Sequence, residues 1–154
     1  GVHFIVHPAR KDETDLELAI QHALERGATE IVMFSALGGR WDQSLANILL
    51  LTLPDLRGVP ARIVDQRQTM VILAGDAEAR IEGRVGDTLS LIALGGDAHG
   101  VTIEGCEYPL NQARLPFGKT LGISNVLIEP TARVSVKEGI VLVIHIRQTA
   151  MGDK

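Results

Sequence analysis

The chain has little sulfur and few aromatic rings. Its 154 residues include one cysteine, Cys106, which excludes an internal disulfide framework and a zinc site built on several cysteines. Only 3% of the residues are aromatic, so Leu, Ile, Val and Ala must build the core that a 45% hydrophobic composition provides. A lone cysteine fits a reducing compartment, and we expect a cytoplasmic protein in which Cys106 is a packing residue.

Other absences narrow the class of function. The net charge is −4, and the 15 basic residues form no cluster, which argues against a nucleic-acid binder. No apolar run approaches the length of about 18 residues that a membrane span needs, and no charged-then-apolar segment opens the sequence. The sequence begins at Gly1 rather than Met and passes at once into the apolar residues 2–6. We therefore expect that a preceding part is missing.

Strand-like and helical patterns alternate in the first 65 residues. Three short apolar runs predict strands at 2–6, 31–34 and 61–64. Between them, helices are predicted at 14–26 and 42–53. The first has a capping box, Thr14 with Glu17, and its apolar side chains share one face. Alternation of strand and helix predicts a parallel sheet with right-handed crossovers.

The pattern changes after Asp65, where no long helical period recurs. Short strands separated by glycine-containing turns are predicted near 69–73, 78–82, 87–94, 100–104, 123–128, 131–136 and 140–147. This succession predicts an antiparallel sandwich or barrel. The expected fold is thus an α/β part over residues 1–67, followed by an all-β part over 68–154 that packs directly against it.

The first candidate site is the acidic segment Lys11-Asp12-Glu13-Thr14-Asp15. It follows a predicted strand and opens a predicted helix, the place where open parallel sheets bind ligands. Helix N–H groups there favour phosphate, and carboxylates there suit Mg²⁺ shared with phosphates. Alternatively, Thr14 and Asp15 only cap the helix and favour its dipole.

The second candidate is the segment 36–43, Ala-Leu-Gly-Gly-Arg-Trp-Asp-Gln, between the next strand and helix. The glycines allow close backbone approach to a ligand, and the Arg40 guanidinium suits a phosphate or carboxylate. Asp42 is suited to a cationic or amino group. The alternative is a tight turn with Asp42 as N-cap. The spacing of a phosphate-binding GxxxxGK[ST] loop is absent.

The third candidate is the segment 117–125, in which Ser124 and Asn125 are neighbouring polar residues. They could bind an amide or pyrimidine edge, or satisfy a turn. Tyr108 and Trp41 could each stack on a flat ring or pack in the core. The five histidines are scattered and suggest no metal site, and His145 is expected to be structural.

Three separated segments together resemble the thiamine pyrophosphokinase family. KDETDLELAI resembles the family's acidic segment and helix. SALGGRWDQSLANILLL resembles its G-A-L-G-G-R-x-D-H signature, with Ser35 for Gly and Gln43 for the common His. GVTIEGCEYPL and FGKTLGISN resemble its thiamine-binding domain. Their order and spacing agree over almost the whole chain.

The resemblance implies an activity and a set of roles. Family members transfer a pyrophosphoryl group from ATP to the hydroxyl of thiamine, giving thiamine diphosphate and AMP, with Mg²⁺ on the phosphates. The roles implied are ATP binding by Lys11, Asp12, Thr14 and Arg40; catalysis by Asp15 and Arg40; metal binding by Asp15 and Asp12; and thiamine binding by Asp42, Tyr108, Ser124 and Asn125. The family also implies a homodimer in which unlike halves of two subunits share the thiamine site.

One departure from the family concerns the start of the sequence. The family's D-G-G-A and G-D-F-D-S segments, the second of which supplies further metal carboxylates, do not occur here. The chain resembles the C-terminal two-thirds of such an enzyme. We therefore expect a truncated three-layer α/β part with an open sheet edge or exposed apolar face, and little or no activity from this chain alone.

Three rival functions remain open from the sequence. One is a thiamine- or nucleotide-sensing module without catalysis. Another is a structural domain whose glycine-rich turns only shape the β part. The third is a phosphotransferase that acts on a different alcohol.

Overall fold

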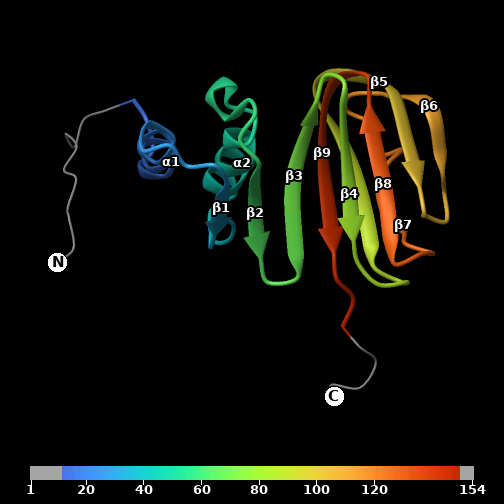
Figure 1. Ribbon diagram of the computed structural model, residues 1–154. Coiled ribbons are helices and arrows are strands. Elements are labelled where there is room, and N and C mark those ends of the chain that lie inside the picture. The colour runs from blue at the N-terminus through green and yellow to red at the C-terminus, as the bar shows by residue number, and fades with distance from the viewer. Residues whose placement is uncertain (1–11, 150–154) are drawn as a thin grey trace.

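The computed structural model describes residues 12–149 (Figure 1). Its helical elements are α1 (Asp15–Glu25), α2 (Trp41–Leu50) and the short 3-10 helix η1 (Pro54–Leu56). Its strands are β1 (Ile31–Phe34), β2 (Ala61–Asp65), β3 (Gln68–Ala74), β4 (Ala77–Glu82), β5 (Thr88–Glu104), β6 (Leu110–Leu115), β7 (Asn125–Val126), β8 (Thr131–Val136) and β9 (Glu138–Ile146). We call residues 12–65 the α/β half and residues 68–149 the β half.

Local signals in the α/β half act as the sequence predicts. The Thr14 hydroxyl accepts a hydrogen bond from the Glu17 N–H at 3.2 Å and caps α1. The helix ends before Gly27, whose φ of +79° a side chain would resist. β1 and β2 are parallel, as predicted, with Ile31 opposite Ala61. The strand predicted at 2–6 lies outside the described residues.

The β half continues the same sheet. β3 turns back from β2 and pairs antiparallel with it, and the main path through the nine-stranded sheet runs β1-β2-β3-β9-β5-β8-β4. Figure 1 shows this sheet curling, so that its last strands face its middle. The antiparallel pairing predicted after Asp65 is confirmed, but the α/β and β parts are joined by one sheet rather than built on two.

Three strand predictions in the β half need correction. The strands predicted at 87–94 and 100–104 form one strand, β5, because a register shift between Leu94 and His99 takes up Gly95 and Gly96 within it. The bend lets β5 pair first with β9 and then with β8. β6 was not predicted because its polar residues hide the alternation, and the strand predicted at 123–128 is only Asn125–Val126.

Two hydrophobic clusters share the middle strands of the sheet. Met70 of β3 and Leu142 of β9 belong to the cluster under the helices, together with Ile20 and Ile63. The next residues along the same strands, such as Val141, face the cluster inside the β half. Strands β3 and β9 are therefore covered on both faces, and the two halves pack directly, as expected.

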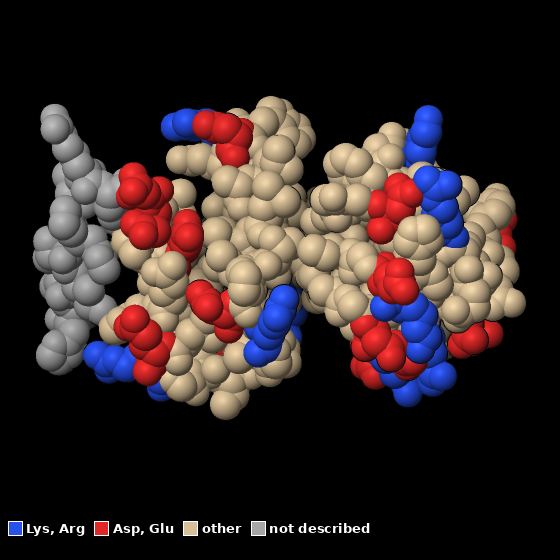
Figure 2. Space-filling view, turned by 90° about the horizontal axis from the view of Figure 1, so that it is seen from above, with Lys and Arg blue, Asp and Glu red and all other residues tan. Residues whose placement is uncertain are grey.

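Both ends of the sheet path are edges among residues 12–149. Among these residues β1 pairs with β2 alone, and Phe34 at its end is 70% exposed. β4 pairs with β8 alone. In Figure 2 the surface is hollowed between the halves, and acidic and basic side chains lie over both of them. None of the described helices has the length and apolar character to span a membrane.

Candidate functional site

A glycine-containing loop links the carboxyl end of β1 to the start of α2. Ser35, Gly38 and Gly39 have φ values of +56°, +123° and +64°, so the chain turns through left-handed conformations there. Two side chains of α2 fix this loop. The Ser44 hydroxyl accepts from the Gly38 N–H at 3.0 Å, and the Asn47 amide donates to the Ala36 carbonyl at 2.7 Å.

Arg40 and Asp42 form a two-pronged ion pair at the end of this loop. Arg40 Nε lies 3.1 Å from one carboxylate oxygen of Asp42, and Nη2 lies 2.5 Å from the other. The hydrogen bond from Arg40, followed by the N–H of Gln43, lowers the pKa of Asp42, while Asp42 raises the pKa of Arg40. Both side chains are exposed, so water screens the pair and a ligand can compete for either partner.

The acidic segment lies at the same edge of the sheet. A short turn after α1 leads straight into β1, so the start of α1 lies at the end where β1 stops. Asp12, Thr14 and Asp15 are all exposed there, and Thr14 uses its hydroxyl as the cap. Lys11 lies outside the described residues. Within 12–149, no group of three or more His, Cys, Asp or Glu side chains forms a metal cluster.

The third candidate segment lies at the far end of the β half. Asn125 is 5% exposed, and its side chain is engaged by main-chain groups: it accepts from the N–H groups of Tyr108 and Val126 and donates to the Tyr108 carbonyl at 2.7 Å. Ser124, at a φ of +60°, donates its N–H to the hydroxyl of Ser90. Tyr108 is 65% exposed. Asn125 therefore holds Tyr108 next to Ser124.

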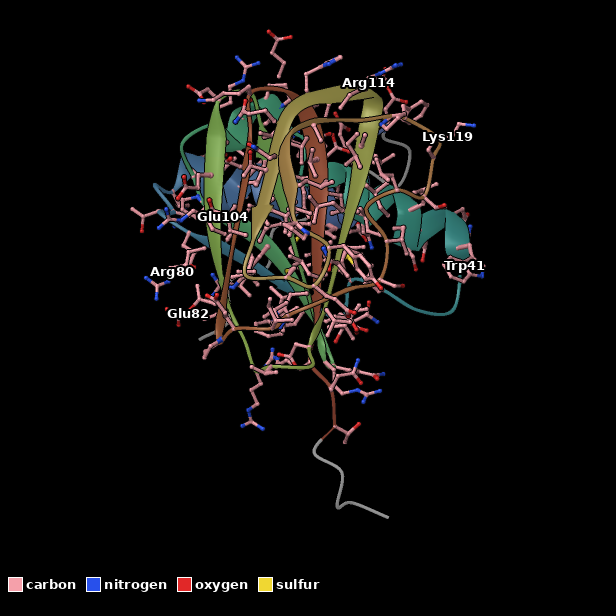
Figure 3. The ribbon with its side chains drawn as sticks, turned by 90° about the vertical axis from the view of Figure 1, so that its right-hand side faces the viewer. Trp41, Arg80, Glu82, Glu104, Arg114 and Lys119 are labelled. Atoms are coloured by element: carbon pink, nitrogen blue, oxygen red, sulfur yellow. The ribbon has the colours of Figure 1, made fainter. Side chains whose placement is uncertain are left out.

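The structure brings the predicted residues into two groups. Arg40 and Asp42 share an edge with the acidic segment, whereas Tyr108, Ser124 and Asn125 form the second group. Strands β3 and β9 lie between β2 and β5, and β7 pairs with β5. Figure 1 accordingly shows α2 and β7 toward opposite ends of the molecule. Trp41 and Lys119, close to each group in sequence, lie on the same side in Figure 3.

Sequence reasoning missed the residues that hold these loops. Ser44 is buried, and its hydroxyl also donates to the Arg40 carbonyl at 3.1 Å. In the β half, Asp97 accepts from the Phe117 N–H at 2.9 Å and from Arg114, which fixes the start of the third segment. The apolar residues of α2 did not indicate Ser44, because Leu45 and Leu49 are exposed whereas Ser44 is buried. Nothing in the sequence pairs Asp97 with Phe117.

Other residues considered from the sequence are structural. His145 and Asp87 form a buried pair with 2.9 Å between Nε2 and Oδ2, so His145 is structural, as predicted. Cys106 is buried, and burial raises the pKa of its thiol to about 11, so the thiol stays protonated. Trp41 is 88% exposed and does not pack in the core.

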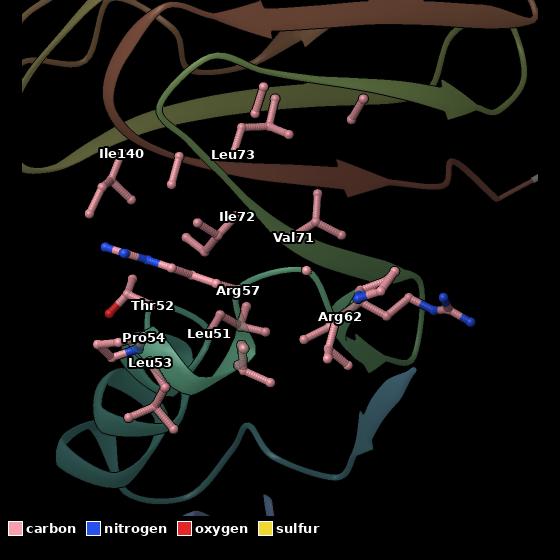
Figure 4. A pocket seen from close by; sticks show the side chains of 18 of the residues that line it. Leu51, Thr52, Leu53, Pro54, Arg57, Arg62, Val71, Ile72, Leu73 and Ile140 are labelled. Atoms are coloured by element: carbon pink, nitrogen blue, oxygen red, sulfur yellow. The ribbon is translucent and has the colours of Figure 1, made fainter. Parts of the chain in front are cut away.

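A large groove lies away from both groups. It has a volume of about 680 Å³ and runs between η1, with the residues after it, and strands β3 and β4. Figure 4 shows Arg57 extending across it, with Ile72 and Ile140 on one side and Thr52 and Pro54 on the other. The groove contains none of the residues predicted for a site.

The sheet topology and the loop between β1 and α2 define a class of protein. In this class a parallel α/β unit, which binds ligands at one edge of its sheet, is joined to a curled β unit. Comparison with known proteins agrees. Residues 1–63 match the family described as "Thiamin pyrophosphokinase, catalytic domain", and residues 78–141 match "Thiamin pyrophosphokinase, vitamin B1 binding domain". Together these matches show that the chain belongs to the thiamine pyrophosphokinase family.

Individual relatives support the same assignment. The thiamine pyrophosphokinase of Bacillus subtilis (strain 168) is 36% identical over 141 residues, covering 91% of this chain and 65% of the relative. The crystal structure of the Bacillus subtilis protein has a TM-score of 0.82 at 34% identity, covering 92% of this chain and 66% of that one. A family protein from Enterococcus faecalis has a TM-score of 0.82 at 30% identity, with coverages of 94% and 68%. The chain thus spans about two-thirds of these relatives.

Proposed function

We propose that the chain is the greater part of a thiamine diphosphokinase, which transfers pyrophosphate from ATP to the hydroxyl of thiamine and gives thiamine diphosphate and AMP. The observation that carries the proposal is the Gly-Gly-Arg-Trp-Asp loop at the carboxyl end of β1, in a chain of this family. That loop supplies a forked cation and a carboxylate at the edge where parallel sheets bind ligands.

The donor side of the reaction belongs to the α/β half. Arg40 binds the nucleotide phosphates and stabilises the charge that builds up on them, and Lys11, Asp12 and Thr14 lie on the same phosphate-binding side. Asp15 and Asp12 are the carboxylates for Mg²⁺, which neutralises phosphate charge when bound. Two exposed carboxylates fit this ion, because Mg²⁺ is held in such sites by one or two carboxylates, water and the substrate phosphates.

The acceptor side combines both halves. Asp42 accepts a hydrogen bond from the amino group of the thiamine pyrimidine. An exposed carboxylate is ionised at neutral pH, and the hydrogen bond from Arg40 lowers the pKa of Asp42 further. Tyr108 offers an exposed ring for stacking, Ser124 offers a hydroxyl, and Asn125 lines the site by holding both segments in place.

The reaction needs positioning more than covalent chemistry from the protein. The thiamine oxygen attacks the β-phosphorus of ATP and loses its proton. The bond from that phosphorus to the oxygen bridging the α-phosphate breaks, and AMP leaves. Arg40 holds the phosphates in line with the oxygen, and Asp42 fixes the pyrimidine ring so that the hydroxyl faces the phosphorus.

The separation of the two groups motivates a homodimer. One copy's Asp42 and another copy's Ser124 then face each other across a shared thiamine site, with residues 1–67 acting as the catalytic domain and 68–154 as the thiamine-binding domain. The apolar side chains of Trp41, Leu45 and Leu49, all exposed at helical spacing on α2, support a contact there. We place the protein in the cytoplasm.

Calorimetry of thiamine binding tests the site. Asp42→Asn is expected to weaken binding of thiamine at least tenfold, whereas Asp55→Asn, an exposed carboxylate on η1, leaves it unchanged. Equal affinities for thiamine in these two variants would contradict the assignment of Asp42.

Activity is tested by release of AMP. The chain alone is expected to release little, and a chimera carrying the remaining third of the Bacillus subtilis relative is expected to restore turnover. A chimera that binds thiamine and ATP without releasing AMP would favour the sensing module instead.

A further inference from the structure

The outer edge of β4 is open to a further strand. β4 ends the sheet path, and the neighbouring β3 pairs with β2 and β9 instead. Two hollows lie along this edge. The groove of about 680 Å³ reaches Ala77 to Ala79, and a second hollow of about 280 Å³ reaches Arg80 to Glu82. Both hollows are bounded on their other side by β3 of the same chain, and hollow space therefore borders β4 along its whole length.

The main-chain groups on this edge can be identified from the register. Gly83, just beyond β4, donates its N–H to the Pro130 carbonyl at 2.9 Å, continuing the pairing with β8. Because hydrogen-bonding residues alternate along an antiparallel strand, Glu78, Arg80 and Glu82 turn their N–H and C=O groups to the free edge. Nothing between residues 12 and 149 hydrogen-bonds to these groups there.

The side chains of the same three residues alternate in charge on the exposed outer face. Arg80 has an unfavourable neighbour in its own sheet, because Arg133 of β8 lies directly opposite. Arg133 is compensated by Glu78 at 3.3 Å, whereas Arg80 reaches Glu82 only along its own strand, at 3.9 Å. Arg80 therefore lacks an acidic residue across from it on the open side.

We propose that β4 pairs antiparallel with β4 of a second copy of this chain, with Ile81 opposite Ile81 of the second copy. Arg80 then lies opposite Glu82 of the second copy, and Glu82 opposite its Arg80. This register also places the residues with free main-chain groups opposite each other. Arg80 of each copy therefore forms main-chain hydrogen bonds with Glu82 of the other.

The neighbouring registers on the same face are poorer. A shift one way places Arg80 opposite Arg80 of the second copy and Glu78 opposite its Glu82. A shift the other way places Glu82 opposite Glu82 of the second copy. Like charges directly opposite destabilise a pair of strands, so charge disfavours both shifts. A register centred on Ala79 also pairs Arg80 with Glu78 of the second copy, and the Glu82→Arg variant separates it from the proposed register.

This contact is separate from the site. Figure 3 shows Arg80 and Glu82 on the side of the molecule opposite Trp41 and Lys119. Pairing through β4 leaves the start of α2 uncovered. The inference does not rest on the proposed function.

Charge reversal tests the register by sedimentation over a series of protein concentrations. Arg80→Glu places Glu opposite Glu, and Glu82→Arg places Arg opposite Arg, so each variant alone is expected to show half the assembly mass of the wild type. An equimolar mixture of the two is complementary at both central pairs and is expected to regain the wild-type mass. The double variant R80E/E82R is expected to assemble alone.

Two controls separate assembly from folding. Arg26→Glu, the same charge change at the end of α1, is expected to keep the wild-type mass. Arg80→Glu places a carboxylate opposite Arg133 and so replaces a repulsive pair with an attractive one. The midpoint of thermal unfolding of this variant, measured on unassembled copies, should therefore not fall. An unchanged mass in both single variants, or a mixture that fails to regain the wild-type mass, would overturn the proposal.

Discussion

The two halves of the molecule bury their apolar side chains differently. The β half encloses its own cluster, in which Leu89, Leu127 and Val134 are fully buried. In the α/β half, the buried residue of α2 is Ser44, while three large apolar side chains of that helix face outward. The helices also complete their cluster with residues of β3 and β9. The β half therefore has an enclosed core of its own, whereas the core of the α/β half depends on strands of the β half.

Truncating a buried leucine should give the largest difference in stability between the two halves. Leu91→Ala, in the cluster of the β half, is expected to lower the free energy of unfolding by about 2–5 kcal/mol because it leaves a cavity. Leu45→Ala, on the exposed side of α2, should change it by less than about 0.5 kcal/mol. Urea denaturation measures both, and similar losses would show that the α2 stripe is buried in solution.

The buried carboxylate of the β half should give the next largest effect. Burial opposes ionisation of Asp87, but the N–H groups of Gln148 and Arg84 and the His145 ring outweigh it and lower its pKa below the usual 3.8. Ionised Asp87 therefore stabilises the fold above about pH 4, and this contribution is lost as the pH falls through the lowered pKa.

Asp87→Asn is expected to cost about 1–3 kcal/mol at neutral pH and to flatten the loss of stability below about pH 4. Asp76→Asn, an exposed carboxylate paired with Lys137, serves as the control. Urea denaturation midpoints of both variants, measured at neutral and at acidic pH, test this prediction. An unaltered acid dependence in Asp87→Asn would rule out this role.

Two buried serines allow a matched comparison of the loops. Ser44→Ala and Ser90→Ala each remove a hydroxyl that accepts a main-chain N–H, and each should cost about 1 kcal/mol. Only Ser44→Ala should also weaken binding of ATP, because it frees the loop before Arg40. Only Ser90→Ala should leave ATP binding intact while weakening thiamine binding. Calorimetry with each ligand measures these effects. Weaker ATP binding in Ser90→Ala, or unchanged ATP binding in Ser44→Ala, would contradict the division of the site.

The smallest effect on folding is expected at Trp41. Trp41→Phe should change the free energy of unfolding by less than about 0.5 kcal/mol, because the ring is exposed. Since Trp41 is the chain's one tryptophan, its fluorescence reports on this surface. Acrylamide should quench it efficiently in the separated chain and less well once copies associate over α2. Equal quenching at all concentrations would argue against that contact.

The sequence predicted the elements with strong local signals. Thr14 with Glu17 marked the start of α1, and the apolar runs marked β1 and β2, because capping and burial depend on neighbours along the chain. The continuous sheet was not predicted, since pairing β3 with β9 joins Gln68 to Ile146 across most of the β half. The bend of β5 at Gly95 was mistaken for a turn, because glycine serves both purposes.

The site could be predicted in parts. The sequence indicated a family through the types and order of Arg40, Asp42, Ser124 and Asn125. It did not indicate how far the first two residues lie from the last two. The ion pair between Arg40 and Asp42 and the engagement of Asn125 by main-chain groups depend on three-dimensional placement. Their proposed contacts with substrates stay predictions.

The strands with two covered faces have a consequence for biosynthesis. The cluster under α1 and α2 includes Leu142 of β9, the last of the described strands. The two helices therefore cannot complete their packing until β9 has been translated. Such distant contacts slow folding, so the nascent α/β segment spends the longest time exposed to chaperones and proteases.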